Sequence, residues 1–457
     1  MVFGIAVNLI VLGYFKYTNF FIETINETLA LGWTFTNIVL PLAISFFTFQ
    51  QIAFLVEVKR EIISEFSFQD YLLFVVFFPQ LIAGPIVHFN EVCDQYRSME
   101  YRRRPWVDVA VGLSILTIGL FKKVVFADTL AFYADPVFAA ANAGTPISFV
   151  ESWTALLAFT AQIYFDFSGY SDMAIGLARL FGIRLPMNFF SPYKADSIIE
   201  FWRRWHMTLS RFLREYLYIP MGGNREGNLK RDINIMVTML IAGLWHGAAW
   251  TFVVWGGLHG LYMIINHRWC ALRYSLGFNV VGRWPSLSRV FRLLAIGVTF
   301  FFVMVAWVFF RSETFGAANL VIIGMVGGGG FTLPASYEAL LGPLANILKA
   351  MGWTFNITPF WGGAPVIAWL VPAYICLWLL PNTQQIFCYY RPTVIQNFKF
   401  HSSVPFMKAS TRKVISLDAL LTWRANSWNG CWIVGLAVIS LIFILVGHDH
   451  EFIYFQF

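Results

Sequence analysis

Long apolar stretches separated by short polar segments make up most of the chain. A helix that crosses the hydrocarbon core of a bilayer needs about 20 mainly apolar residues, and several stretches reach that length. They lie approximately at residues 1–22, 33–58, 107–133, 151–181, 232–266, 293–310, 363–381 and 429–447. The 232–266 stretch is long enough for a tight helical hairpin with its bend near Ala248–Thr251. The pattern predicts an all-α polytopic membrane protein.

Two further apolar segments do not fit a simple membrane span. Residues 70–90 are interrupted by Pro79, Gly84 and Pro85 and have basic residues on both sides, which favours a re-entrant hairpin. Residues 197–220 alternate cations with aromatic and aliphatic residues at helical spacing. An apolar face opposite a basic face predicts one continuous helix lying in the membrane interface.

The connecting segments differ in charge, which predicts their sidedness by the positive-inside rule. Those rich in lysine and arginine are expected to be cytoplasmic: 91–106, 184–231, 267–292 and 383–428. Those poor in cations are expected to face outward: 23–32, 134–150 and 311–362. There is no internal repeat and no boundary of a soluble domain. We therefore interpret residues 1–457 as a single membrane-embedded domain.

Composition narrows the classes of protein further. Hydrophobic residues make up 58% of the chain and charged residues 12%, about half the charged fraction of soluble domains. The net charge of +7 fits basic cytoplasmic loops, and no basic tract interleaved with aromatics points to nucleic acid. Five scattered cysteines without a CxxC pair predict neither a disulfide framework nor a metal site.

His246 is the first candidate for chemistry, in the sequence GLWHG at 243–247 inside an apolar run. Ionisable groups in lipid are costly and mark a site or a pairing partner. A neutral imidazole can take a proton from a hydroxyl, which makes His246 a candidate general base for acyl transfer. Gly243 and Gly247 allow a backbone or a ligand to approach closely. The structural alternative is a histidine that only pairs with a neighbouring helix.

His206 is the second candidate. It is expected one helical turn from Arg203 and from Ser210 on the predicted interfacial helix. The guanidinium groups of Arg203 and Arg204 suit phosphates of a ligand or a lipid headgroup. The alternative is a solvated amphipathic face without a binding role.

Asp166 and Asp172 place two carboxylates in an otherwise apolar stretch. Six residues apart, they lie on different helix faces and do not form a catalytic acid pair. We favour ion pairing with one of three arginines, Arg179, Arg203 or Arg204, over catalysis. Weaker signals are His88, His259 and the terminal group His448, His450 and Glu451, where an exposed tail is favoured over a metal site.

Several motifs in order resemble the bacterial membrane-bound O-acyltransferase family. The main ones are YFDFSGYSDMAIG at 164–176, FWRRWHMTLSRFLREYLYIP at 201–220 and WHG at 245–247. Shorter family-like stretches are LGYFKYTNFF at 12–21, FFPQLIAGPI at 77–86, GLFKKVVFADTL at 119–130 and GGNREG at 222–227. The likeness is strongest to the membrane subunits that acetylate alginate and cellulose, and it extends to about residue 311.

The resemblance implies a ring of transmembrane helices, with re-entrant and interfacial helices, around a thin centre. It implies that His246 and His206 are the catalytic residues. Around them we assign a candidate substrate-binding set: Arg203, Arg204, Trp245, Ser210, Asp166 and Asp172. Family members carry further apolar helices before the LGYFKY stretch. We therefore expect this chain to have a shortened N-terminus or to be a fragment.

The function implied is transfer of acetyl groups from a cytoplasmic donor, acetyl-CoA, for O-acetylation of an exported polysaccharide such as alginate or cellulose. The implied setting is the bacterial inner membrane, with an SGNH-esterase-like acetyltransferase and a polysaccharide export complex as partners, and without a bound cofactor. Three alternatives stay open: D-alanyl transfer to teichoic acids, a transporter and a non-catalytic scaffold. A transporter predicts paired half-length repeats, and none is visible in the sequence.

Overall fold

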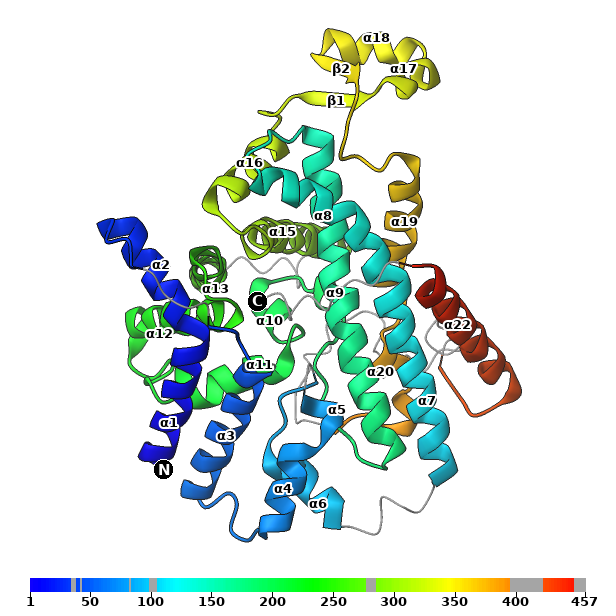
Figure 1. Ribbon diagram of the computed structural model, residues 1–457. Helices are drawn as coiled ribbons and strands as arrows, with labels where there is room; N and C mark the ends of the chain where they lie inside the picture. The colour runs from blue at the N-terminus through cyan, green and yellow to red at the C-terminus, as the bar shows by residue number, and fades with distance from the viewer. Residues whose placement is uncertain are drawn as a thin grey trace.

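The computed structural model describes residues 1–33, 38–41, 43–81, 84–97, 105–276, 285–394 and 422–447. Helices dominate the described part of the chain (Figure 1). Four helical runs in it are long and apolar enough to cross a membrane: Val2–Leu29, Pro105–Asn142, Ser288–Arg311 and Ser427–Val446. The predicted all-α polytopic class is confirmed.

The N-terminal helices form one side of the molecule. α1 (Val2–Leu12), a π-helical turn (Gly13–Tyr17) and α2 (Thr18–Leu29) make one long run, and α3 (Ile44–Lys59) packs against α1. The predicted 33–58 span is therefore too long, because the helix begins only at Ile44, after Pro41. Proline lacks the N–H that a helix interior uses, so it commonly marks such a boundary.

The segment predicted to be broken is built from short helices: α4 (Phe68–Val76), α5 (Phe78–Leu81) and α6 (Phe89–Arg97). Phe77 between the first two is extended, and Pro79 is the second residue of α5. Proline is tolerated in the first turn of a helix but cannot continue a helix that precedes it, which accounts for the interruption before α5.

Two long helices form the central pair. α7 (Pro105–Phe121) continues through a π-helical turn (Lys122–Ala127) into α8 (Asp128–Asn142), and α9 (Phe149–Leu180) lies beside α7 (Figure 1). Their backbones meet at glycines: a Cβ at Gly119 would lie 2.6 Å from the Gly169 carbonyl oxygen. Small residues that let backbones approach are typical of helix pairs in membranes.

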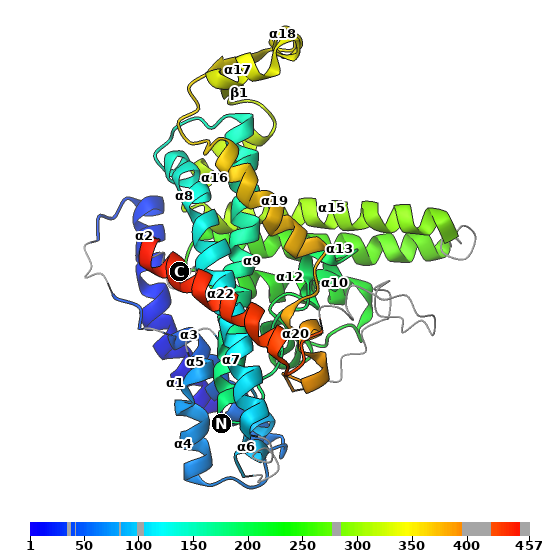
Figure 2. The ribbon, with the colours of Figure 1, turned by 90° about the vertical axis from the view of Figure 1, so that its right-hand side faces the viewer.

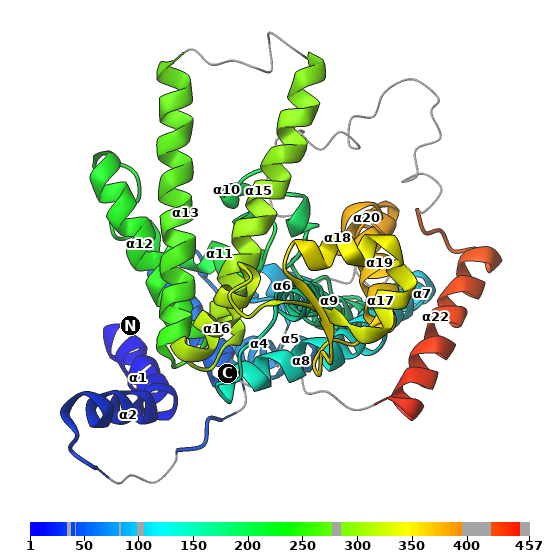
Figure 3. The same ribbon diagram turned by 90° about the horizontal axis from the view of Figure 1, so that it is seen from above.

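The predicted hairpin is α12 (Gly227–His246) and α13 (Trp250–Ser275), with its bend within the predicted region. α15 (Pro285–Arg311) runs beside α13, and the two project together from the rest of the molecule (Figures 2 and 3). Between this group and the central pair lie α10 (Ile198–Trp202), α11 (Met207–Leu213) and a π-helical turn (Arg214–Tyr218). A 3-10 turn (Pro192–Lys194) precedes them.

The remaining elements lie toward the C-terminus. After α16 (Phe315–Met325), β1 (Phe331–Pro334) pairs in parallel with β2 (Trp353–Asn356), and α17 (Ala335–Leu341) and α18 (Pro343–Ala350) connect them at one end of the molecule (Figure 1). The register pairs Phe331 with Trp353. The others are α19 (Ala364–Trp378), α20 (Thr383–Ile386), a 3-10 turn (Cys388–Tyr390) and α22 (Ser427–Val446), which packs against α7.

Candidate functional site

His246 is the last residue of α12, after which Gly247 leaves the helical conformation and α13 begins at Trp250. Its side chain is buried, with a residue exposure of 3%. Three aromatic rings surround the imidazole edge-on: Trp245 and Trp255 at 5.0 Å between centroids and Phe310 at 5.5 Å. The ring therefore lies in an aromatic chamber from which most water is excluded.

The glycines around His246 serve the crossing of two helices. A Cβ at Gly243 would lie 2.2 Å from the Phe252 carbonyl oxygen, and one at Gly247 would lie 2.1 Å from the Phe252 ring. In the partner helix, a Cβ at Gly256 would lie 2.2 Å from the Met239 carbonyl oxygen. The close approach expected at these glycines is therefore made by α13 and its side chains.

The N-terminal run braces the end of α12. Lys16 is buried, and its ammonium group donates to the Trp245 carbonyl oxygen and, at 3.4 Å, to that of His246. The Tyr17 hydroxyl donates to the Leu244 carbonyl oxygen at 3.1 Å. The last carbonyls of a helix lack partners inside it and carry partial negative charge, so a cation there is favourable. Sequence reasoning missed this contact, because the two segments lie more than two hundred residues apart.

The continuous interfacial helix predicted over 197–220 is wrong. α10 ends at Trp202, and α11 begins only at Met207. His206 stands between them with a left-handed backbone, φ +43°, and is fully buried. Two bonds to the non-helical segment 188–190 stabilise the break: Phe190 N–H donates to the Arg204 carbonyl oxygen and Met207 N–H to that of Asn188. Most of this segment is core rather than a surface that faces the interface.

The break brings the two histidines together. The His206 and His246 ring centroids are 6.3 Å apart, with the planes inclined by 60°. The His206 ring is nearly perpendicular to that of Phe167 of α9, with centroids 4.7 Å apart. On its other side, the His206 Nδ1 is 3.0 Å from the Asn188 side-chain oxygen. Two segments thus supply the buried imidazole pair, and Phe167 and Asn188 contact it from two others.

Trp245 forms a wall of the chamber. Its indole stacks on Phe49 at 5.0 Å, and Phe49 stacks on Phe212 at 4.1 Å. The His206 and Trp245 ring centroids are 6.2 Å apart. Ser210 does not join them, because its hydroxyl donates to the Trp205 carbonyl oxygen at 3.3 Å within its own segment.

The two arginines of the segment differ in exposure. The side chain of Arg203 is 62% exposed and lies 3.5 Å from Glu200, whereas Arg204 is buried and donates to Glu200 at 2.8 Å. In the described part of the chain, neither arginine pairs with His206 or His246. Arg203 remains accessible to an anion, and the Arg204 Nε–H is already bonded to a carboxylate.

The predicted arginine partners of the two carboxylates are wrong. Asp166 pairs with Lys123 at 2.9 Å, and Asp172 pairs with Lys122. Arg179 instead pairs with Asp108 at 2.7 Å. Lys122 and Lys123 lie on the π-helical turn that faces α9, so their side chains reach the carboxylates directly. Asp172 also accepts from the Thr383 hydroxyl and lines a polar pocket with Lys122, Ser171, Asn188 and Asn382.

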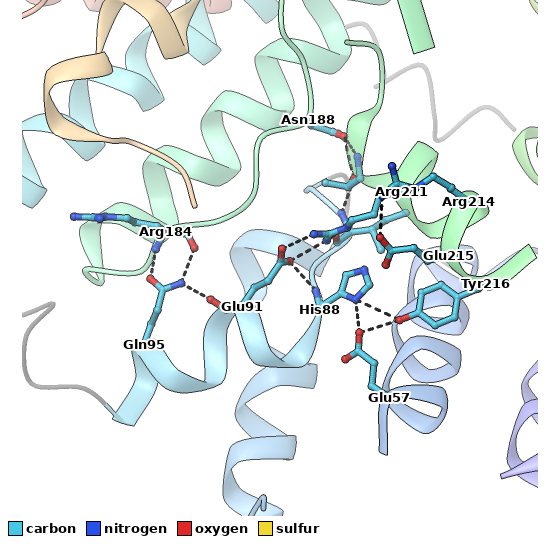
Figure 4. Close-up of polar contacts among 12 residues, drawn as sticks. Glu57, His88, Glu91, Gln95, Arg184, Asn188, Arg211, Arg214, Glu215 and Tyr216 are labelled. Carbon is cyan, nitrogen blue, oxygen red and sulfur yellow. Dashed lines mark hydrogen bonds and ion pairs between the residues drawn. The ribbon is translucent and has the colours of Figure 1, made fainter. Parts of the chain in front are cut away.

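A second polar cluster joins Glu57, His88 and Tyr216, and His88 was only a weak signal for it in the sequence. Figure 4 shows Glu57, His88 and Tyr216 pointing toward one another. The Tyr216 hydroxyl donates to Glu57 at 2.9 Å, and Glu57 pairs with the His88 Nδ1. Residues of α3, of the loop before α6 and of the π-helical turn Arg214–Tyr218 meet here, so spacing along the chain did not indicate it.

The neighbouring pair of Glu91 and Arg211 ties α6 to α11. The Arg211 guanidinium donates to both carboxylate oxygens of Glu91, at 3.0 Å to Oε2. Burial pushes the pKa of Glu91 upward, but the hydrogen bonds and the charge of Arg211 hold that pKa below its ordinary value. The carboxylate stays ionised and acts as a fixed strut between the two helices.

His259 also lies close to the site. It is fully buried on α13, and its ring is 4.9 Å from that of Trp255, which contacts His246. The Trp202 indole N–H donates to the His259 Nδ1 at 3.3 Å. Within the described ranges no three histidine, cysteine or acidic side chains gather as metal ligands. The terminal His448, His450 and Glu451 and most of the basic segment 383–428 lie outside those ranges.

Comparison with known proteins places these features in context. A family model for membrane-bound O-acyltransferases matches residues 31–307. A peptidoglycan O-acetyltransferase of Helicobacter pylori is 44% identical over 73% of this chain and 66% of its own length. A probable alginate O-acetylase of Pseudomonas aeruginosa is 39% identical over 82% of this chain and 66% of its own length. The chain thus spans just under two thirds of the length of these relatives.

A teichoic acid D-alanyltransferase of Streptococcus thermophilus is more distant. It is 27% identical over 59% of this chain and 68% of its own length. The matched family range contains both His206 and His246.

Proposed function

We propose that this chain, which belongs to the membrane-bound O-acyltransferase family, passes acetyl groups from a cytoplasmic donor for the O-acetylation of an exported polysaccharide such as alginate or cellulose. The observation that carries the proposal is the buried histidine pair, with ring centroids 6.3 Å apart inside a multi-pass membrane protein. The likeness to proteins named for O-acetylation of peptidoglycan and of alginate supports acetyl as the acyl group and a carbohydrate polymer as its destination.

The chemistry follows from what a neutral imidazole does in a dry site. His246 takes the proton of the acceptor hydroxyl while the hydroxyl oxygen attacks the carbonyl carbon of the acetyl thioester. The carbon–sulfur bond then breaks, and the proton passes to the departing thiolate. His206 assists from the facing side. The walls of Trp245, Trp255 and Phe310 keep water from competing with the acceptor hydroxyl.

The donor and the setting are part of the same proposal. Acetyl-CoA is the donor substrate, reached from the cytoplasm, and the protein works in the bacterial inner membrane. The acetyl group passes outward to an SGNH-esterase-like acetyltransferase that acts with a polysaccharide export complex. Arg203, exposed beside the buried segment, is a cation that an anionic donor group can reach.

The test is a comparison of histidine variants in cells that export the polymer. We expect His246→Ala and His246→Gln to lose polymer acetyl ester, while His267→Ala, on a partly exposed stretch of α13, keeps wild-type levels. His246→Gln fills the space of the ring, so it separates loss of the base from loss of packing. The amount of folded protein in the membrane is measured for each variant. Wild-type acetylation in His246→Gln would refute the mechanism.

D-alanyl transfer to teichoic acids is the second candidate, favoured by the 27% identity to a teichoic acid D-alanyltransferase. The protein in vesicles, offered an acetyl thioester or a D-alanyl thioester, distinguishes the two by which acyl group it transfers. A scaffold or a transporter would transfer neither, and a scaffold would keep its function in His246→Gln.

A further inference from the structure

The side chain of Asn188 lies at the centre of a set of hydrogen bonds around His206. Its oxygen is 3.0 Å from the His206 Nδ1 and 3.0 Å from the Thr208 hydroxyl, and it accepts from the Thr208 backbone N–H at 3.4 Å. Its amide nitrogen donates to the Ser171 hydroxyl at 3.2 Å. Asn188 and His206 are both fully or almost fully buried, with exposures of 1% and 0%.

These contacts fix which end of the amide is oxygen. A backbone N–H can only donate, so the atom that faces the Thr208 N–H must be an acceptor. The Thr208 hydroxyl accepts from the Ile86 N–H at 3.0 Å, which leaves its own hydrogen for the same amide oxygen. A reversed amide would place two donor hydrogens against the Thr208 N–H. The orientation of the Asn188 amide therefore follows from donor and acceptor chemistry alone.

The amide in turn determines the state of the imidazole. An oxygen that accepts from Nδ1 requires a hydrogen on Nδ1, and a neutral imidazole carries one hydrogen. The Nε2 of His206 then holds a lone pair. That nitrogen is buried and has no hydrogen-bond partner among the described residues. Neutral His206 can accept a hydrogen there but cannot donate one.

The backbone supports the same arrangement. The Asn188 carbonyl oxygen accepts from the Met207 N–H at 2.9 Å, directly after the left-handed His206. The side chain of Asn188 thus holds the His206 ring, and its carbonyl oxygen holds the peptide group that follows His206. A left-handed backbone costs a non-glycine residue about 1–2 kcal/mol, so it persists only where surrounding contacts impose it.

We propose that Asn188 is a positioning residue that holds neutral His206 as the tautomer with hydrogen on Nδ1, so that Nε2 serves as a proton acceptor toward the histidine pair. This inference rests on the proposed acyl transfer for its consequence in catalysis, and on geometry alone for the tautomer. In this arrangement, the Nε2 of His206 accepts a hydrogen from the reacting hydroxyl or from His246. It excludes polarisation of the donor carbonyl by the neutral His206 ring, because Nε2 has no hydrogen to donate.

The first measurement reads the tautomer without reference to activity. The full chain, labelled with ¹⁵N-histidine and placed in lipid nanodiscs, gives separate nitrogen shifts for protonated and unprotonated ring nitrogens. The His206 signals are assigned by their loss in His206→Asn. We expect Nδ1 protonated and Nε2 unprotonated in the wild type and in Ser171→Ala, which removes only the contact on the far side of the amide. Hydrogen on Nε2 in the wild type would overturn the proposal.

The second measurement separates positioning from folding. Asn188→Leu removes the acceptor, and we expect a mixture of tautomers with a fall in kcat of about 10–10³-fold at little-changed KM, since a wrong tautomer disables a catalytic histidine. Asn188→Asp keeps an acceptor for Nδ1–H, and its charge favours the protonated ring. We expect that variant to keep the tautomer and to shift the pH profile of kcat to higher pH.

The outcomes are distinct. If Asn188→Leu does not fold, the wild-type tautomer and the pH shift of Asn188→Asp still decide the proposal. An unshifted pH profile in Asn188→Asp, or wild-type kcat in a folded Asn188→Leu, would refute it. If the wild type transfers no acetyl group, the proposed function fails, while the nitrogen shifts still report whether Asn188 sets the tautomer.

Discussion

The two buried histidines lie in the same chamber, but different kinds of backbone structure position them. His246 ends the regular helix α12, whose backbone hydrogen bonds lie within the helix itself. His206 occupies a left-handed turn between the two short helices α10 and α11, and two backbone hydrogen bonds tie this turn to Asn188 and Phe190. A regular helix positions its side chains by local geometry, whereas a break must be imposed by a distant segment. The first histidine depends on the crossing of α12 with α13, and the second depends on Asn188.

The largest expected effect is on catalysis. We expect His246→Ala to lower acetyl transfer by about 10²–10⁴-fold, the usual range for removal of a general base. His206→Ala should lower it strongly but less completely, with His206→Asn in between because an amide keeps part of the hydrogen bonding. Rates of acetyl transfer in vesicles at equal amounts of folded protein measure the order. Normal transfer in His206→Ala would remove this histidine from the site.

The helix crossing behind His246 offers a matched pair of glycines. We expect Gly256→Ala to lower stability by about 1–3 kcal/mol, because its Cβ would lie 2.2 Å from the Met239 carbonyl oxygen. At Gly257 the nearest atom to a new Cβ is a Leu240 methyl at 3.4 Å, so Gly257→Ala should be neutral or slightly stabilising. Thermal unfolding in detergent compares the two. Equal unfolding temperatures would show that the crossing tolerates a wider separation.

The brace from the N-terminal run is expected to contribute about 1–3 kcal/mol. Lys16→Met removes the donor to the Trp245 and His246 carbonyl oxygens and leaves those buried acceptors unpaired. Lys59→Met, at an exposed lysine on α3, is the control and should change stability by less than about 0.5 kcal/mol. The unfolding temperature measures both. A Lys16→Met protein as stable as the control would mean that the end of α12 needs no cation.

The smallest effect tests the backbone difference directly. At position 206 we expect glycine to be more stable than alanine by about 1 kcal/mol, because φ is +43° there. At position 246, in a right-handed helical conformation, we expect alanine to be more stable than glycine by about 0.5 kcal/mol. Unfolding of the four variants measures the two differences. If the same residue, glycine or alanine, were the more stable at both positions, the backbone difference between the two histidines would be contradicted.

Sequence reasoning found the features that depend on local pattern. The apolar run of 232–266 predicted the hairpin, and the apolar stretch at 151–181 predicted α9, which spans Phe149–Leu180. Both histidines were singled out as ionisable groups among apolar residues. These predictions were correct because composition decides whether a segment can be buried away from water. The 3.6-residue periodicity then decides which face of the helix is buried.

The errors share one cause. The continuous helix over 197–220 was wrong because the break at Arg203–His206 is held by Asn188 and Phe190, and helical spacing in the sequence does not register such bonds. The arginine partners of Asp166 and Asp172 were wrong because the lysines that pair with them lie on another element, beside α9.

By itself, the sequence determined a helical membrane protein, the two histidines and the glycines that mark a close approach. Only the tertiary structure decided that the histidines face each other, that Lys16 caps the end of α12 and that Asn188 sets the state of His206. The physical reason is the range of the forces. Burial and helical hydrogen bonding act within a few residues of the chain, while each contact that shapes the site joins segments brought together by the fold.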